Sequence, residues 1–396
     1  MHHDDDAARV AQLARALVRA HDPREVPVQD FLAARYDAGL AWVHFPVGLG
    51  GLGVSRGHQA VADAILGEAG APAAYPLNPI GYGMAAPTLH EHAQTAELKS
   101  RWLRPLATTE HIWCQLFSEP GAGSDLAGLA TAAVRDGAGW KVNGQKVWTT
   151  LAHRARWALL IARTDPDVPK HRGLTYFVLD MHAPGVETRP LRQMTGQAEF
   201  NEVYLTDVHV PDEHRLGEVG AGWQVAMTTL SNERTSIGAS GTRRGAGTIA
   251  DAVALWGNRP ERRTPVLRDR LARLWLRSEA QRLTSERARA TATVRGPGAE
   301  GSVGKLVGAE LNQAVYEFCM DLLGPEATLY DDYGMREVSS IDAYGSVQQR
   351  FLRSRANTIE GGTSEVLRNI IGERLLGLPG DLRADSGRPW SEVPRG

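Results

Sequence analysis

The chain has little cysteine. Its two thiols, Cys114 and Cys319, are too few for a disulfide framework or a four-thiolate metal site, and this shortage is typical of a reducing compartment. Long apolar runs are also missing, because none approaches the roughly 20 residues that a membrane-spanning helix needs. The first residues alternate charged and apolar side chains at helical spacing, which is not the pattern of a signal peptide. We therefore expect a cytoplasmic protein with no membrane span.

Neither sign of charge is in excess. The chain has 44 lysines and arginines against 46 aspartates and glutamates, for a net charge of −2. This balance gives no strong field to attract a polyanion, so nucleic acid is not expected as a partner. Lysine itself is scarce, at five residues, but coding bias explains this and we draw no mechanism from it. The length of 396 residues allows two or three domains with an internal core.

Hydrophobic periodicity divides the chain into three domains of an α+β fold. Between residues 7 and 105 apolar residues recur at spacings of three and four, which predicts helices. Short β-branched and aromatic runs then alternate with turn residues, which predicts a small antiparallel sheet. After Gly222 the helical period returns, most clearly in an apolar stripe between Val303 and Leu322 that includes Val315 and Phe318, as in a helix bundle. We expect an N-terminal α-helical domain (1–110), a middle antiparallel β domain (111–220), a C-terminal α-helical bundle (221–380) and a tail (381–396) that is loosely ordered or packed on another subunit.

Two glycine-containing sequences suggest turns. Asn143-Gly144 stands between two runs that contain valine and tryptophan, and both residues tolerate the positive φ of a type I′ turn, so a β-hairpin is predicted there. The Gly-x-Gly-x-x-Gly sequence at 48–53 matches a dinucleotide-binding fingerprint. However, Pro46 precedes it, its surroundings are helical, and no alternation of strands and helices follows. A turn between helices is the better interpretation.

Two segments near the predicted sheet contain residues that suit a ligand. The loop from Ser118 to Asp125 has small residues, two hydroxyl groups and many free backbone N–H groups, which can bind a phosphate or the edge of a flat ring. Trp148, Thr149 and Thr150 place an aromatic ring beside hydroxyl groups. By itself, the loop is better explained as an ordinary turn, and the aromatic ring of Trp148 as core packing.

Glu233 is the first candidate for a catalytic base. On the helix predicted after the sheet, Trp223, Ala226, Leu230, Glu233 and Ile237 are spaced 3, 4, 3, 4, which places this carboxylate within an apolar stripe. No basic residue stands three or four positions away. A carboxylate buried without a partner has a raised pKa, which suits a general base that acts on a carbon acid. An arginine from another helix would instead make a structural ion pair, and the stripe alone does not decide between the two.

Glu360 is the second acidic candidate. It lies in Ala356-Asn-Thr-Ile-Glu-Gly-Gly-Thr-Ser-Glu365, ahead of a predicted helix. Thr363 or Ser364 suits the N-cap of that helix, and the paired glycines suit a close approach of the backbone to a ligand. Helix capping alone explains most of this pattern.

Taken together, these sequences resemble the acyl-CoA dehydrogenase family from about residue 30 to residue 380. The order of a helical domain, a β domain and a second helical domain is also that of the family. Four blocks carry the resemblance: CQLFSEPGAGSDL (114–126), WKVNGQKVWTT (140–150), MTGQAEFNEVYLTDVHVP (194–211) and RANTIEGGTSEVLRNIIGERLLGLP (355–379).

The resemblance implies an FAD-dependent oxidoreductase that converts an acyl-CoA thioester to the trans-2-enoyl-CoA. A carboxylate base would remove the α proton while the β hydrogen leaves as a hydride to flavin N5. The resemblance also implies an electron-transfer flavoprotein as electron acceptor, a homodimer or homotetramer, and a role in lipid metabolism.

Carried over position by position, the family's flavin contacts fall on Gln115, Leu116 and Ser118 at the ring, Trp148 and Thr150 at its other edge, and Thr363 and Glu365 near the pyrophosphate of FAD. Ser124 would lie near the pantetheine arm of the substrate. The backbone N–H of Gly361 would polarise the thioester carbonyl together with a flavin ribityl hydroxyl. That pair would act as an oxyanion hole for the developing enolate.

The family places its base at one of two positions. In the medium-chain type it directly precedes the Gly-Thr pair of the C-terminal block, where this chain has Gly361, with Glu360 one residue earlier. In the isovaleryl and long-chain type it lies on the helix after the β domain, and the matching residue is Glu233. The resemblance and the apolar stripe agree, so we take Glu233 as the base and Glu360 as the reserve. By the same match, Arg234 would help to shape the substrate pocket.

Two segments depart from the family. Members often hold the diphosphate and adenine of FAD across a dimer interface, with an Arg-x-x-Phe-Gly segment and a later Gln-x-x-Gly-Gly-x-Gly segment. The corresponding stretches here, Arg259 to Arg270 and Asp321 to Pro325, lack these sequences. Either other residues hold the adenine end of FAD, or this chain lacks one of the two parts of that binding site.

Two alternatives to a dehydrogenase stay open on this fold. The altered adenine-end segments suit an FAD-deficient or catalytically reduced subunit of a heteromeric acyl-CoA dehydrogenase. An oxygen-using acyl-CoA oxidase or flavin monooxygenase would share the same blocks. The acyl group is not fixed by the sequence, because the depth of the pocket depends on how the helices pack.

Overall fold

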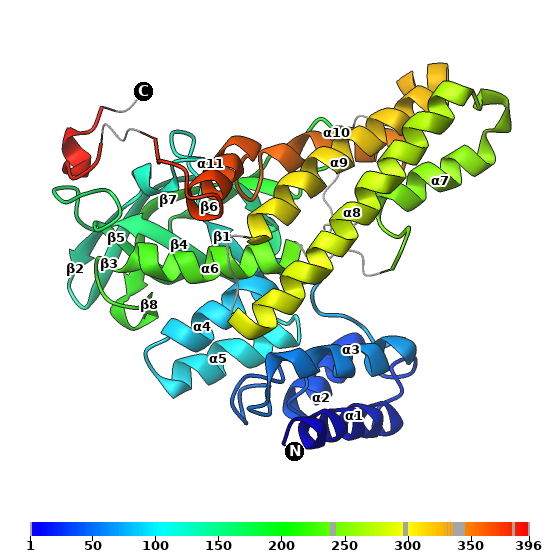
Figure 1. The fold of residues 1–396 in the computed structure, drawn as a ribbon. Helices are drawn as coiled ribbons and strands as arrows, with labels where there is room; N and C mark the ends of the chain where they lie inside the picture. Colours follow the sequence, from blue (N-terminus) through cyan, green and yellow to red (C-terminus); the bar gives the residue numbers. More distant parts are fainter. Residues whose placement is uncertain are drawn as a thin grey trace.

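The computed structural model describes residues 2–237, 243–295, 300–330, 332, 334–335, 345–381 and 385–394, with side chains except at 2–4, 233–237, 289 and 292–295. Figure 1 shows a β-sheet with the N-terminal helices on one side of it, while the C-terminal helices lie across and beside it. The order along the chain is helical, then β, then helical. This confirms the predicted α+β fold class.

The N-terminal domain is made of α1 (His2–Ala20), α2 (Val28–Asp37), α3 (Gln59–Glu68), α4 (Ala86–His92) and α5 (Ala96–Ala107). Val10 of α1 and Phe31 of α2 are fully buried in a core that these first helices form among themselves. A π-helical turn, Gly81–Ala85, leads into α4. Leu89 of α4 and Trp102 of α5 instead pack with residues of the sheet. The first three helices and the next two therefore serve different cores.

The glycine-rich sequence at 48–53 is a turn between α2 and α3, as expected. Gly48, Gly50 and Gly53 have φ values of 86°, 81° and 71°. A Cβ atom on Gly50 would lie 2.6 Å from the Tyr36 ring. Backbone conformation and close packing therefore explain these glycines, because glycine adopts positive φ without steric cost.

The middle domain is a single mixed sheet with the strand order β6-β7-β3-β2-β4-β5-β8, and β1 pairs with β4. Its strands are β1 (Trp113–Leu116), β2 (Ala132–Asp136), β3 (Gly139–Thr150), β4 (Trp157–Arg163), β5 (Leu174–Asp180), β6 (Val186–Pro190), β7 (Phe200–Pro211) and β8 (Arg215–Leu216). Pairing is antiparallel except where β4 meets β1 and β2. The sheet is thus mostly, but not wholly, the antiparallel one that was predicted.

β4 lies at the centre of this sheet and is buried on both faces. Leu159 and Ile161 face the cluster that includes α4, α5 and α6, whereas Ala158 and Leu160 face a second cluster with β3 and β7. Side chains alternate between the two faces of a strand, so one short apolar run supplies both cores. The flavin-contact blocks that the resemblance names flank this rigid centre.

The predicted hairpin at Asn143-Gly144 is wrong. These residues lie inside β3, and the turn between β2 and β3 is at Gly137, which has a φ of 56°. Asp207 on β7 takes a φ of 51° at a register shift, and Asn143 exchanges two hydrogen bonds with it, at 3.1 and 2.8 Å. A Cβ on Gly144 would lie 2.3 Å from Thr131 Oγ1. Close strand packing, and not a turn, therefore requires this glycine.

The C-terminal domain comprises α6 (Gly222–Ile237), α7 (Thr248–Asn258), α8 (Pro265–Arg295), α9 (Glu300–Leu323), α10 (Val347–Ser354) and α11 (Ser364–Arg374). α9 is its central helix and packs against α7, α8, α10 and α11. Val315 and Phe318 of the predicted apolar stripe are fully buried on it. α8 and α9 extend away from the sheet (Figure 1). Within the described ranges, no helix is long and apolar enough to cross a membrane.

The C-terminal tail returns to the sheet of its own chain. The backbone N–H of Trp390 donates to Val168 O at 2.9 Å, and its indole Nε1 donates to Gly128 O at 3.1 Å. Arg163 Cζ lies 4.1 Å from the centre of the Trp390 ring, which is 9% exposed. Residues 385–394 are therefore docked on the middle domain of their own chain, in contrast to a loosely ordered tail.

Replacing Trp390 by alanine is expected to release this tail. Loss of a buried aromatic ring costs about 3–5 kcal/mol in a full core, and about 2–3 kcal/mol is expected at this more peripheral contact. Since 1.4 kcal/mol is a tenfold change in an equilibrium, amide hydrogen exchange of the tail should accelerate by roughly 10²-fold. Exchange mass spectrometry of peptides covering 385–394 measures this. Leu378→Ala, at a side chain that is 56% exposed, is the control, and unchanged exchange in the Trp390 variant would mean that other contacts hold the tail.

Candidate active site

β1 and the loop after it hold the first predicted flavin contacts. β1 lies parallel to β4 with Leu116 opposite Leu160, and both side chains are fully buried. Gln115 is half-buried, and its Oε1 is buried without a hydrogen-bond partner in the described part of the chain. The carbonyl of Ser118 accepts a hydrogen bond from the backbone N–H of Val147 at 2.9 Å. The first two sequence blocks are therefore adjacent in the fold.

Lys146 holds the loop after β1 against β3 from inside the sheet. Its side chain is fully buried, and Nζ donates to the carbonyl groups of Phe117 (2.9 Å) and Ile161 (3.0 Å). It also donates to Glu119 Oε1 at 2.9 Å. The Glu119 carboxylate accepts two more hydrogen bonds, at 2.6 and 2.9 Å, from the backbone N–H groups at 130–131. Burial alone would raise the pKa of Glu119, but the Lys146 ammonium and these hydrogen bonds together hold it below its usual value.

The far end of the same loop is exposed and is held by a lysine. Ser124, the predicted contact of the pantetheine arm, is exposed. Lys170 Nζ donates to both carboxylate oxygens of the next residue, Asp125, at 2.8 Å. The same ammonium lies 2.5 Å from the carboxylate of Asp385 in the tail. The docked tail therefore helps to hold the loop that carries Ser124.

Trp148 occupies a β-bulge near the end of β3. The register with β7 shifts between Lys146 and Thr149, and Trp148 takes a φ of 59°, which is uncommon for a residue other than glycine. Its side chain is 59% exposed. Thr149 Oγ1 is buried without a hydrogen-bond partner among the described residues, and Thr150 is half-buried. Strained residues and unpaired buried hydroxyl groups concentrate where ligands bind.

A series of contacts joins this bulge to the C-terminal block. Trp148 packs edge-on against Phe200 with ring centroids 5.9 Å apart, and Arg353 Cζ lies 5.8 Å from the centre of the same Phe200 ring. Arg353 makes two hydrogen bonds to the Glu360 carboxylate, at 2.9 and 2.8 Å. Its Nε also lies 3.8 Å from the buried carboxylate of Glu199. The structure therefore brings the β3 bulge and the turn at Glu360 together across a domain boundary.

Glu360 is a partner in an ion pair. Besides its two bonds from Arg353, Oε1 accepts a hydrogen bond from Asn357 Nδ2 at 2.8 Å. Both of its oxygens are thus engaged, and the carboxylate would have to leave these donors before it could remove a proton. This geometry favours a structural role for Glu360 over the reserve role of base.

The turn continues through Gly361 into α11. Gly361 and Gly362 have φ values of 60° and 93°, in the region that favours glycine. Of the two N-cap candidates, Thr363 has this role, because its Oγ1 accepts a hydrogen bond from Val366 N at 3.2 Å. The Glu365 side chain is 80% exposed. The first turn of α11 therefore presents free N–H groups near the end of the Glu360 turn, where an anionic group can bind.

α9 supports the same turn through two residues that the sequence reasoning missed. Lys305 Nζ donates to the carbonyl groups of Asn357 at 2.8 Å and Gly362 at 2.7 Å. Asn312 Nδ2 donates to Asn357 Oδ1 at 2.6 Å. A signal was available, because Lys305 is one of five lysines in the chain and stands among apolar residues of a long helix. The other lysines include exposed and half-buried residues, so the scarcity of lysine alone does not identify the buried ones.

α6 begins where the apolar stripe predicted and carries Glu233 and Arg234 in its C-terminal half. Ala226 is fully buried, and Trp223 and Leu230 pack against the same cluster. α6 contacts α4, β5 and α9, so it lies between the N-terminal helices and the helix that supports the Gly361 turn. The side chains of Glu233 and Arg234 lie outside the described residues, and their roles remain predictions.

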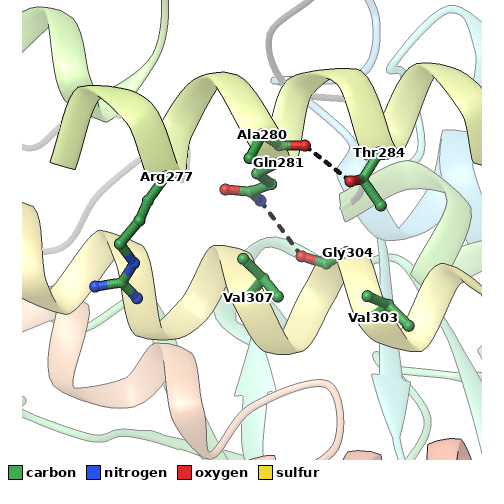
Figure 2. A pocket seen from close by; sticks show the side chains of 7 residues that line it. All are labelled: Arg277, Ala280, Gln281, Thr284, Val303, Gly304 and Val307. Carbon is green, nitrogen blue, oxygen red and sulfur yellow. Dashed lines mark hydrogen bonds between the residues drawn. The ribbon is translucent and has the colours of Figure 1, made fainter. Parts of the chain in front are cut away.

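An open groove lies between α8 and α9 (Figure 2). Its volume is about 230 Å³, and its lining residues are Arg277, Ala280, Gln281, Thr284, Val303, Gly304 and Val307. Gln281 Nε2 donates to Gly304 O across it at 3.4 Å. These lining residues include no predicted site residue, so we do not place the active site there. Over the part of the chain that the structure describes, no group of His, Cys, Asp or Glu side chains could hold a metal ion.

The two segments that depart from the family contact each other. Arg259 makes an ion pair with Glu326 at 2.9 Å, and Arg270 makes another with Asp321 at 2.6 Å. Arginines that could have faced a diphosphate are thus paired with carboxylates of the same chain.

The residues near the β3 bulge and the Glu360 turn fit FAD. Gln115 Oε1, Thr149 Oγ1 and Ser364 Oγ are buried without hydrogen-bond partners in the described ranges, although buried polar atoms are normally paired. They belong to three separate blocks of sequence, and Trp148 is exposed beside one of them. Similar unpaired atoms occur elsewhere, for example Trp102 Nε1. The fit therefore rests on the three family blocks to which these atoms belong, and not on their being unpaired alone.

Family models match the chain over most of its length. The models described as acyl-CoA dehydrogenase N-terminal, middle and C-terminal domains match residues 7–110, 114–208 and 220–376. Among curated relatives, acyl-CoA dehydrogenase FadE34 of Mycobacterium tuberculosis is 43% identical over 94% of this chain, which spans about half (50%) of that relative's length. Acyl-CoA dehydrogenase IpdE1 of the same organism is 37% identical, over 87% of this chain and 86% of the relative.

Solved structures show the same fold. The Tcur3481-Tcur3483 steroid ACAD has a TM-score of 0.74 and 26% identity, over 94% of this chain and 97% of that one. The ChsE4-ChsE5 complex of Mycobacterium tuberculosis has a TM-score of 0.68 and 28% identity, over 96% and 98% of the two chains. A glutaryl-CoA dehydrogenase of Mycobacterium smegmatis in complex with FADH2 has a TM-score of 0.69, and at 20% identity it shows the fold alone.

Proposed function

The chain belongs to the acyl-CoA dehydrogenase family of flavin-dependent oxidoreductases, and we propose that it converts an acyl-CoA thioester to the trans-2-enoyl-CoA with FAD. The observation that carries the proposal is the convergence of the β1 loop, the β3 bulge and the Glu360 turn, which are distant in sequence. When bound, FAD would accept the β hydrogen as a hydride. Electrons would then pass to an electron-transfer flavoprotein.

Residues of this chain would supply the base, the oxyanion hole and the substrate contacts. Glu233 takes the α proton, and the electron pair of that C–H bond enters the new double bond as the β hydrogen leaves with its own pair. The backbone N–H of Gly361 polarises the thioester carbonyl and stabilises the negative charge that develops on its oxygen. Ser124 lies along the pantetheine arm, and Arg234 shapes the acyl pocket. The position of Glu233 within an apolar stripe of α6 supports its role, because desolvation raises the basicity of a carboxylate.

The cofactor would be held by three parts of the fold. Gln115, Leu116 and Ser118 meet the ring from β1 and its loop, and Trp148 and Thr150 meet it from the β3 bulge. Thr363 and Glu365 lie at the N-terminus of α11, where free N–H groups and the helix dipole attract the pyrophosphate.

Anaerobic titration with a panel of acyl-CoAs tests this function. Straight, branched, aromatic and steroid-derived thioesters belong in the panel, since one solved relative is titled a steroid ACAD. We expect one acyl class to bleach the visible flavin band, with the enoyl-CoA formed in equal amount. A protein that holds a full complement of FAD and is bleached by no acyl-CoA would contradict the proposal.

A second candidate is an FAD-deficient or catalytically reduced subunit of a heteromeric acyl-CoA dehydrogenase. Its support is the pairing of Arg259 with Glu326 and of Arg270 with Asp321, in and next to the two segments that lack the family's adenine-end sequences. Two solved relatives, Tcur3481-Tcur3483 and ChsE4-ChsE5, are also each named for two components. Flavin well below one FAD per chain after incubation with excess FAD would favour this candidate, and one FAD per chain would count against it.

A further inference from the structure

Lys305 holds both ends of the turn that contains Gly361. It lies on α9 and is 8% exposed, and its Nζ donates to Asn357 O at 2.8 Å and Gly362 O at 2.7 Å. The first carbonyl stands four residues before Gly361 and the second stands one residue after it. A single buried ammonium group therefore connects the start of the turn to its end.

The turn needs such a restraint because its two glycines allow the backbone several conformations. Gly361 and Gly362 are consecutive residues with positive φ, and glycine adopts either sign of φ with little cost. Local sterics therefore do not fix the direction of the Gly361 N–H. Hydrogen bonds from a charged donor are roughly twice as strong as those from a neutral one. The Gly361 N–H lies in the peptide between Glu360 and Gly361, and two such bonds hold peptides before and after it, which limits how far this peptide can rotate.

Backbone hydrogen bonds from Ile359 and Glu360 to Ala356 O close the start of the turn, and the other side-chain donors described at residues 357–362 bind to its side chains. Asn312 holds the side chain of Asn357, and Arg353 holds the carboxylate of Glu360. Lys305 differs from both, because it bonds to the backbone of the turn itself. Its removal would leave the ion pair and the amide contact in place while freeing the glycine peptides.

We propose that Lys305 is a positioning residue, which aims the N–H of Gly361 at the thioester carbonyl by bonding to the carbonyl groups of Asn357 and Gly362. This inference rests on the proposed function and deepens it. Lys305 does not touch the substrate, and it acts through the peptide of Gly361. Catalysis should therefore suffer more than substrate binding when it is replaced.

The test compares Lys305→Met with Lys141→Met, a matched control at a lysine that is 48% exposed on β3. The probe is the 3-thia analogue of the acyl-CoA that best reduces the wild-type flavin. Its sulfur acidifies the α proton and replaces the β carbon, so it can be deprotonated but cannot transfer a hydride. Enolate formed beside flavin is read as a long-wavelength absorption band. We expect Lys305→Met to retain FAD and a similar KM, to lose about 10- to 100-fold in kcat, and to need a higher pH for the band.

The outcomes separate the inference from the function on which it rests. If the wild-type protein neither bleaches with any acyl-CoA nor forms the band, the proposed function fails. If the wild-type protein does both, and Lys305→Met matches it in kcat and in the pH dependence of the band, the inference is overturned. If Lys305→Met does not fold, Lys305→Gln is measured instead. Its amide is neutral and its side chain is one bond shorter, so its hydrogen bonds to the two carbonyl groups are weaker and we expect an intermediate loss in kcat. Wild-type kcat and band titration in that variant would overturn the inference in the same way.

Discussion

Glu233→Gln is expected to lower the rate of flavin reduction by acyl-CoA by about 10²- to 10⁴-fold, the usual contribution of a general base. An amide has nearly the shape of the carboxylate but cannot accept the α proton. The position on α6 and the match to the isovaleryl and long-chain type both support this assignment. Stopped-flow absorbance under anaerobic conditions, with a substrate found in the titration, measures the rate directly.

Glu360→Gln is the companion measurement, because Glu360 is the reserve base. Its carboxylate is bonded to Arg353 and Asn357, so the amide should disturb the turn without removing the proton acceptor. We expect a loss of less than about tenfold, well short of a general base's contribution. Reduction at the wild-type rate in Glu233→Gln, with reduction abolished in Glu360→Gln, would reverse the assignment. FAD content is measured for both variants, so that loss of cofactor is not mistaken for loss of the base.

Lys146→Met is expected to lower the free energy of unfolding by about 3–5 kcal/mol, the range found when one partner of a buried ion pair is removed. The methionine leaves the Glu119 carboxylate buried without its cation, and it leaves the carbonyl groups of Phe117 and Ile161 without a donor. The loop that carries Ser118 should loosen at the same time. FAD affinity should therefore fall together with stability.

Urea unfolding of this variant, with Lys141→Met as control, measures the loss. Lys141 lies on the same strand but is 48% exposed, so its replacement should stay within about 0.5 kcal/mol of the wild type. The double variant Lys146→Met with Glu119→Gln should recover part of the loss, because it no longer buries an unpaired charge. A Lys146 variant as stable as the control would show that the buried pair is not a major source of stability.

The ion pair of Lys146 and Glu119 also predicts that the free energy of unfolding falls at acid pH. The pKa of Glu119 is lower in the folded chain than its ordinary value of 4.5. A depressed carboxyl pKa stabilises the folded state above the unfolded pKa, and this contribution is lost as the pH falls through the folded pKa. The difference in stability between wild type and the double variant should therefore shrink below about pH 4.5.

Local patterns in the sequence determined the main elements of this protein. The order of helical, β and helical parts follows from hydrophobic periodicity, and α6 and α9 lie where their apolar stripes predicted them. These features are accessible because a helix or strand repeats its buried positions every few residues. The four family blocks similarly indicate the flavin chemistry, since each block is short and continuous in sequence.

Tertiary structure decided the features that depend on contacts between residues far apart in the sequence. Asn143-Gly144 has the residues of a turn, but the closeness of Thr131 and the bulge at Asp207 make it part of a strand. Glu360 resembles a displaced base until Arg353 is seen to hold it. Likewise, the tail has the composition of a loose segment, yet Trp390 donates a hydrogen bond to Gly128 O and its ring packs against Arg163 of the middle domain.

The two buried lysines show most directly what the sequence by itself does not predict. Lys146 and Lys305 are ordinary basic residues in the sequence, and their importance comes from carbonyl groups that belong to other elements of the fold. Periodicity reports which side of an element is buried, but it carries no information about which distant polar group will face a given side chain. The sequence therefore determined the architecture and the chemistry of the blocks, and only the packing of separate elements determined how the candidate site is held.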